Sequence, residues 1–187
     1  MQNQEFKEIG KRLFSEGLVG GNFGNMSIRG VSKDGQKGFF ITSSGSYLDE
    51  EDDLKFVDLK GIPETGASSE WRVHHQIYSK SPKTSAIVHA HPAMSVAASF
   101  YYDEIIPNDS EGKMLCPKIP VRTGEPGTDE LAENISSAVS ISPVAIARGH
   151  GTFACAGNLK EAYLLTSIAE HACRVIYYMG GFGGRSL

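Results

Sequence analysis

The sequence predicts an α/β protein that forms a single domain over residues 1–187. Segments with apolar residues at helical spacing alternate along the chain with short apolar runs typical of strands. A chain of 187 residues can bury a substantial core without disulfides. No repeat, low-complexity tract or linker divides it. These observations together favour one domain that contains both helices and strands.

The composition excludes several classes of protein. Lys and Arg number 18 against 22 Asp and Glu, and no basic block occurs, which argues against nucleic acid or an anionic membrane as the main partner. The apolar runs are shorter than a membrane span, and the N-terminal residues lack the apolar core of a signal peptide. The chain has an odd number of cysteines at wide spacing, namely Cys116, Cys155 and Cys173. This pattern fits buried thiols in a reducing cytosol better than a disulfide framework. We therefore expect a soluble, cytoplasmic protein.

In the N-terminal part of the chain, the sequence pattern predicts a helix followed by three strands. Residues 4–16 have helical spacing, and Gly17 ends that helix. A glycine-rich loop from Leu18 then leads into a strand that ends near Arg29. Two further strands are expected at 37–42 and 55–59, separated by a Ser/Gly turn at 43–46 and by an acidic run at 49–53 that we expect to be solvated or to start a helix.

In the rest of the chain, expected helices and strands continue to alternate. A helix is expected from 68 to about 80, with Ser68 or Ser69 as its N-cap and Glu70 near the positive end of its dipole. Thr128 and Asn158 are the expected N-caps of two later helices. The expected strands are 86–91, 105–106, 144–147 and 152–156, with an edge strand or extended connection at 114–122. The expected helices are 93–100, 128–139 and 158–178, with a loop at 109–113 and a flexible tail from Gly180.

Three histidines form a candidate metal site. His89 and His91 are two residues apart at the end of a strand, so their side chains should project from the same face. His150 lies between Gly149 and Gly151, which allow close approach of the backbone. Three imidazoles with an open fourth position are typical of catalytic zinc. His74 and His75 lie within a predicted helix and are assigned to packing or solvent.

Two glycine- and serine-rich turns are open to two interpretations. The segment from Leu18 to Arg29 and the turn at 43–46 could bind phosphate through backbone amides and hydroxyls. For either segment taken alone, an ordinary strand connection is the favoured interpretation. Neither matches a Walker loop or a dinucleotide-binding fingerprint.

Several of these motifs, in their order and spacing, resemble the class II aldolase/adducin family, and most of all its L-fuculose-1-phosphate aldolases. The resemblance covers about residues 5–178 and rests on GNFGNMSIR, ITSSG, SSEWRVHHQIY, VHAHP and RGHGTFACAGNLKEAY. It implies a three-layer α/β/α fold with a mainly antiparallel central sheet. It also implies a C4 homotetramer with active sites between subunits.

The same resemblance implies the function and the residues that perform it. The expected enzyme is an aldehyde-lyase that reversibly cleaves a ketose 1-phosphate to dihydroxyacetone phosphate and an aldehyde, through an enediolate stabilised by a metal. It implies that Glu70 is the catalytic carboxylate and a candidate fourth ligand. The metal ligands would be His89, His91 and His150, holding Zn²⁺ or another divalent ion such as Co²⁺, Mn²⁺ or Fe²⁺. The phosphate-binding positions would be Asn25, Ser44, Gly45, Ser68 and Ser69.

The sequence departs from bacterial fuculose aldolases at one catalytic position. Those enzymes carry a tyrosine in the segment that corresponds to residues 105–120, and this chain has none there. Glu111, Tyr177 and Tyr178 are the candidates for protonating the aldehyde oxygen; a solvated Glu111 and tyrosines packed in the core are the simpler interpretations. The aldehyde is therefore left open.

Other functions remain in view. Pentulose-phosphate 4-epimerases resemble the chain but tend to have aspartate at the position of Glu70, and methylthioribulose-phosphate dehydratases tend to lack the Ser-Ser-Glu pattern. A non-enzymatic, adducin-like interaction module would have lost the three histidines. A structural zinc site would need a fourth ligand, and the nearest cysteine, Cys155, has the surroundings of a core strand.

Overall fold

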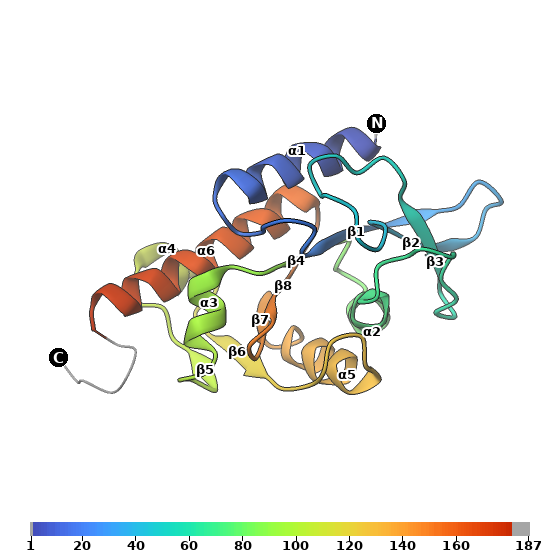
Figure 1. Cartoon of the computed structure of the whole chain (residues 1–187). Coiled ribbons are helices and arrows are strands. Elements are labelled where there is room, and N and C mark those ends of the chain that lie inside the picture. Colours follow the sequence, from blue (N-terminus) through green and yellow to red (C-terminus); the bar gives the residue numbers. More distant parts are fainter. Residues whose placement is uncertain (1, 181–187) are drawn as a thin grey trace.

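The computed structural model describes residues 2–180, which form an eight-stranded sheet with helices on both faces (Figure 1). The strand order across the sheet is β3-β2-β1-β4-β8-β7-β6-β5. The strands are β1 (Asn25–Val31), β2 (Lys37–Ile41), β3 (Lys55–Asp58), β4 (Ala86–Ala90), β5 (Glu104–Ile105), β6 (Ile119–Arg122), β7 (Val144–Ala147) and β8 (Gly151–Ala156).

The sheet is mixed: most of its strand pairs are antiparallel, as expected, but one pair departs from that expectation. β6 and β7 run parallel, whereas the other pairs in the described chain are antiparallel. The parallel pair arises because α5 (Asp129–Ala138) connects β6 to β7, and such a crossover returns the chain in the same direction. Antiparallel pairing still dominates, and the central strands β1, β4, β8 and β7 follow it.

The helices form two outer layers. α2 (Trp71–Lys80) packs against α5 beneath the sheet in Figure 1, whereas α1 (Gln2–Ser15) and α6 (Leu159–Tyr178) lie above it. The short helices α3 (Ala93–Ala98) and α4 (Ser110–Leu115) contact α6. β4 is buried along its whole length because both faces are covered: Ile87 belongs to the core under α2 and α5, and Val88 to the core under α1.

Some predicted boundaries and caps are wrong. Neither Ser68 nor Ser69 caps α2, since the N-cap residue is Glu70 and no side-chain cap is formed. Residues 110–115, within the expected loop and extended segment, form α4, because Asp109 accepts a hydrogen bond from the Gly112 amide as an N-cap. β6 is not an edge strand, since it lies between β7 and the two-residue β5.

Other expectations are confirmed. Thr128 and Asn158 cap α5 and α6 by accepting hydrogen bonds from the amides of Leu131 and Glu161. Cys116, Cys155 and Cys173 are buried free thiols. None of the described helices has the length and apolar character needed to cross a bilayer. The predicted flexible tail lies, apart from Gly180, outside the described residues.

Candidate metal centre and active site

Three histidine side chains converge at one end of the sheet. His89 is in β4, His91 follows that strand, and His150 lies in the turn between β7 and β8. The ring centroids of His89 and His150 are 4.7 Å apart, and those of His91 and His150 are 4.9 Å apart. One potential ligand atom from each residue lies within 4.8 Å of the others. The alternation expected along the strand therefore brings His89 and His91 together, with their Nε2 atoms 3.0 Å apart.

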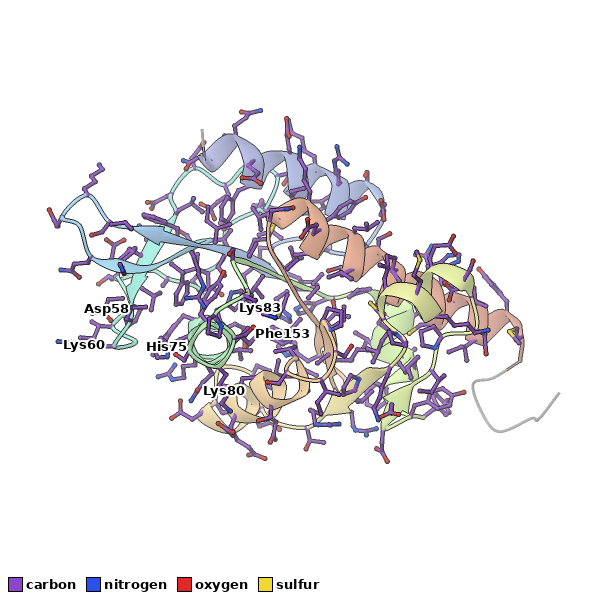
Figure 2. All side chains as sticks on the ribbon, turned by 180° about the vertical axis from the view of Figure 1, so that it is seen from behind. Asp58, Lys60, His75, Lys80, Lys83 and Phe153 are labelled. Carbon is purple, nitrogen blue, oxygen red and sulfur yellow. The ribbon has the colours of Figure 1, made fainter. Side chains whose placement is uncertain are left out.

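The orientation of His89 is fixed by β8. Its Nδ1 lies 2.9 Å from the carbonyl oxygen of Thr152, which can only accept a hydrogen bond, so Nδ1 carries the proton and Nε2 presents a lone pair. The ring stacks on Phe153 with centroids 4.1 Å apart. Phe153 pairs with His89 in the sheet register and lies in the interior beside α2 in Figure 2. Both contacts fix the ring before any ligand binds.

The two glycines beside His150 serve backbone packing. Gly149 has a φ of +69°, and a side chain there would also meet the Phe100 ring. A Cβ on Gly151 would lie 2.2 Å from the carbonyl oxygen of Ala90. Gly151 thus allows the His150 turn to approach β4, and Gly149 allows it to approach Phe100, which agrees with the close backbone approach expected from the sequence.

The electrostatics of the three histidines fit a divalent cation. Burial lowers the pKa of each ring, with repulsion from neighbouring histidines adding to the effect at His89 and His91, and the pKa of His91 falls to about 4. All three imidazoles are therefore neutral near pH 7, the state that coordinates metal. Nδ1 of His150 is buried without a hydrogen-bond partner in the described chain. Neutral, converging imidazoles with an unsatisfied nitrogen suit Zn²⁺ or a related ion.

Glu70 is a buried carboxyl at the start of α2, outside the group of three histidines. Its Oε1 accepts a hydrogen bond of 2.9 Å from the amide of Gly127, in the loop after β6, whereas its Oε2 is buried and has no partner among the described residues. Burial raises the pKa of Glu70, and the Gly127 amide offsets part of that rise. A buried, protonatable oxygen without an internal partner makes Glu70 a candidate proton donor or acceptor.

The five predicted phosphate-binding residues come from three segments that lie side by side. Asn25 opens β1 opposite His89, and its buried Oδ1 has no hydrogen-bond partner within residues 2–180. The turn with Ser44 and Gly45 is joined to the segment before α2, because the Ser44 amide donates to the Gly66 carbonyl. The Ser68 amide in turn donates to the carbonyl of Thr42, which pairs with Met26 beside Asn25. Ser44, Gly45 and Ser69 are exposed, whereas Ser68 is buried.

Sequence reasoning missed Glu51, which organises the turn. The acidic run was expected to be solvated or to start a helix, yet Glu51 lies outside the helices and is only 2 % exposed. Its carboxylate accepts hydrogen bonds from the Ser43 amide, the Ser46 hydroxyl and the Asp53 amide. A glutamate amid acidic neighbours gives no pattern that distinguishes a buried carboxylate from a solvated one.

The remaining candidates lie elsewhere. Glu111 is exposed in α4 and accepts a hydrogen bond from Ser110. Tyr177 and Tyr178, at the end of α6, are 47 % and 77 % exposed, so they are not core residues. His74 is buried and 2.6 Å from the Ser27 hydroxyl. His75 is beside the loop that carries Lys60 in Figure 2, with its Nε2 3.0 Å from the Leu59 carbonyl.

The glycine-rich loop before β1 packs on the histidines. The carbonyl of Leu18 accepts a hydrogen bond from the His91 amide, and the ring of Phe23 stacks on the His91 ring at 5.5 Å. A side chain at Gly24 would collide with the carbonyl oxygen of His89. This loop therefore packs against the candidate metal ligands His89 and His91, which goes beyond an ordinary strand connection.

Comparison with known proteins finds relatives along nearly the whole chain. Residues 4–177 match the family model "Class II Aldolase and Adducin N-terminal domain". The chain is 34% identical over 176 residues to an "L-fuculose phosphate aldolase" of Methanococcus maripaludis, covering 92% of this chain and 94% of the relative. The crystal structure of L-fuculose-1-phosphate aldolase from Thermus thermophilus is similar with a TM-score of 0.87 and 33% identity, covering 98% of this chain and 97% of that one. A "3-oxo-tetronate 4-phosphate decarboxylase" of Haemophilus influenzae is 25% identical, covering 96% of this chain and 89% of the relative.

Proposed function

Because the chain belongs to the class II aldolase and adducin family, we propose that it is a metal-dependent aldolase acting on a ketose 1-phosphate similar to fuculose 1-phosphate. The products would be dihydroxyacetone phosphate and an aldehyde, and the reaction would be reversible. The observation that carries the proposal is the convergence of His89, His91 and His150 as three neutral imidazoles. Glu70, with its raised pKa, adds the acid–base group that such a reaction needs.

The three histidines would hold the metal and Glu70 would move the proton. A divalent cation bound there supplies Lewis-acid chemistry that draws negative charge from substrate oxygens. Cleavage of the carbon–carbon bond leaves a negatively charged three-carbon fragment, and Oε2 of Glu70 would return a proton to its carbon. The Gly127 amide holds Oε1, so the proton stays on the oxygen that has no internal partner.

The phosphate would be bound by Asn25, Ser44, Gly45, Ser68 and Ser69. The hydrogen bonds that link their three segments support this assignment, as do the exposed hydroxyls of Ser44 and Ser69. Backbone amides and hydroxyls can bind phosphate without a lysine. Holding the non-reacting phosphate would place the reacting carbons at the metal centre.

We further propose Zn²⁺ as the native metal, a homotetramer as the assembly and the cytoplasm as the location. Three imidazoles suit zinc, although Co²⁺, Mn²⁺ or Fe²⁺ would fit the same ligands. In a tetramer with active sites between subunits, Tyr177 or Tyr178 of a neighbour could protonate the aldehyde oxygen, with Glu111 as the alternative. The exposure of both tyrosines at the end of α6 is compatible with that role.

A decarboxylase is the second candidate, because a relative over nearly the same length is a "3-oxo-tetronate 4-phosphate decarboxylase". Loss of carbon dioxide also leaves a negatively charged carbon that requires a cation and a proton donor. Epimerase or dehydratase chemistry on the same residues and a non-enzymatic interaction module are less favoured, because Glu70 and all three histidines are present.

Metal content and product release test the proposal together. Purified protein is analysed by mass spectrometry for metals and assayed, with a coupled enzyme, for dihydroxyacetone phosphate released from fuculose 1-phosphate and ribulose 1-phosphate. We expect about one divalent metal per chain and release that a chelator abolishes. Metal without triose phosphate would reject the aldolase and direct the search to decarboxylation, epimerisation or dehydration. Absence of both metal and turnover would reject the enzyme altogether.

A further inference from the structure

Glu170 is a buried carboxylate in the middle of α6, with its side chain only 4 % exposed. Its Oε2 accepts hydrogen bonds from the amide of Ser95 at 2.8 Å and from the hydroxyl of Ser95 at 3.0 Å. Its Oε1 accepts from the amide of Met94 at 3.1 Å. Arg174, one turn further along α6, lies 3.4 Å from the same Oε1. Burial of a carboxylate costs free energy unless hydrogen-bond donors compensate it. The position of Glu170 therefore depends on these particular donors.

These donors belong to the first turn of α3, which begins two residues after the candidate metal ligand His91. The N-cap of α3 is Pro92, and it provides no side-chain cap. The first amides of a helix have no partner within the helix and need an acceptor from elsewhere. Glu170 provides that acceptor from α6, and it thereby anchors the first turn of α3, which directly follows His91 and Pro92.

The other end of α3 is bonded to the turn that carries His150. Ser99, the C-cap residue, accepts a hydrogen bond from the Gly149 amide through its hydroxyl, at 2.9 Å. Its carbonyl accepts a hydrogen bond from Arg148, whose guanidinium also pairs with Asp103 at 2.5 Å. α3 therefore joins His91 to the residues just before His150, and a shift of this helix would change the distance between the two imidazoles.

We propose that Glu170 is a positioning residue of the metal centre, which fixes α3 and through it the spacing of His91 and His150. A six-residue helix has little stability of its own, so its placement depends on tertiary contacts such as those of Glu170. The inference rests on the proposed function in one respect, since it requires that His89, His91 and His150 bind metal. It assigns to Glu170 no contact with substrate.

The test compares Zn²⁺ affinity in Glu170→Gln and in a matched control. Glutamine retains the shape of the side chain but replaces one acceptor oxygen with an NH₂ group, which cannot accept from the α3 donors. Glu161→Gln makes the same change at an exposed position of α6. Affinity is measured by competition with a chelating dye, and the melting temperature of each metal-free protein is recorded. We expect Zn²⁺ binding to weaken by roughly 10–100-fold in Glu170→Gln and to be unchanged in Glu161→Gln.

Each outcome has a defined meaning. A lower melting temperature with wild-type Zn²⁺ affinity in Glu170→Gln would show a merely structural role and overturn the inference. If Glu170→Gln does not fold, Ser95→Ala removes one of the hydrogen bonds, and an unchanged affinity in that variant would overturn the inference equally. Failure of the wild-type protein to bind Zn²⁺ would instead reject the proposed metal centre, and this inference with it.

Discussion

At the scale of single residues, Glu70 combines features that disfavour stability. A carboxyl with a buried, unpartnered Oε2 and a pKa raised by burial is costly to keep ionised. Buried carboxyls of this kind are common where a protein needs a proton donor or acceptor. Replacing such a carboxyl often stabilises the fold at the expense of activity. For a carboxyl whose folded pKa is raised, its contribution to stability is lost as the pH rises through that pKa.

We therefore predict opposite effects of Glu70→Gln on activity and stability. Turnover should fall by roughly 10²–10⁴-fold, because glutamine cannot transfer the proton. Metal content should be retained, and the melting temperature of the metal-free protein should rise at neutral pH. Steady-state assays, mass spectrometry and calorimetry measure the three quantities. Full turnover with metal bound would show that Glu70 has another role.

His74 makes the stability of the protein depend on pH. It is buried with its Nε2 unpartnered in the described structure, and burial lowers its pKa to about 3 from an ordinary value of 6.5. The unfolded chain therefore binds a proton at mildly acidic pH that the folded chain does not. The stabilising contribution is complete above pH 6.5 and is lost as the pH falls from 6.5 toward 3.

We predict that wild-type protein loses stability on acidification faster than His74→Gln. The difference should approach about 1.4 kcal/mol per pH unit below about pH 6. Urea unfolding of both metal-free proteins between about pH 4.5 and 7.5 measures it. Subtracting the two curves removes the contribution of the other histidines, which both proteins share. Parallel curves would show that His74 does not titrate in this way.

At the scale of helices and strands, the local sequence pattern predicts the direction of a side chain better than it predicts the hydrogen-bond partners of a buried polar group. The period of two along β4 places His89 and His91 together, and the caps at Thr128 and Asn158 follow from local hydrogen bonds. Glu51 was missed because a glutamate amid acidic neighbours gives no pattern that marks it as buried, although its donors are local. Glu170 was missed because its donors are supplied by tertiary structure. The donors of Glu170 lie 75 or 76 residues away in sequence. Ser68 does not cap α2 because the helix begins only after Glu70, and the Ser68 hydroxyl accepts from the Glu70 amide, before the first helical residue.

The turn at Ser43–Ser46 gives a prediction for substrate affinity. Glu51→Gln should loosen that turn, because the carboxylate receives two donors from it, the Ser43 amide and the Ser46 hydroxyl. Loss of one hydrogen bond to a charged acceptor costs about 1.5 kcal/mol. If that free energy is lost from phosphate binding, KM should rise by about tenfold. We expect kcat to change little, because the phosphate does not react.

A neighbouring glutamate provides the control for this prediction. Glu50→Gln makes the same substitution at an exposed position and should leave KM unchanged. A lowered kcat at constant KM in Glu51→Gln would show that the turn acts on the reacting end of the substrate rather than on its phosphate.

At the scale of the whole molecule, the candidate site is formed where strands meet that are distant in sequence. β1, β4, β8 and β7 are adjacent in the sheet, and this order brings Asn25, His89 and His150 to one end. Nothing in the local sequence specifies that order, so the layered fold and its sheet were expected from resemblance to a family. The parallel β6–β7 pair was not expected, because it follows from the α5 crossover and from no motif.

A metal held by these strands should stabilise the fold, and this gives the final prediction. A cation bound by His89, His91 and His150 joins β4 to the turn between β7 and β8, and the unfolded chain cannot form that site. At free Zn²⁺ about 100 times the dissociation constant, unfolding should require about 2.7 kcal/mol more than in the metal-free protein. His150→Ala should lose most of this gain, whereas His171→Ala, at an exposed position on α6, should retain it. Denaturant unfolding with and without Zn²⁺ measures the gain, and an equal gain in His150→Ala would place the bound metal elsewhere.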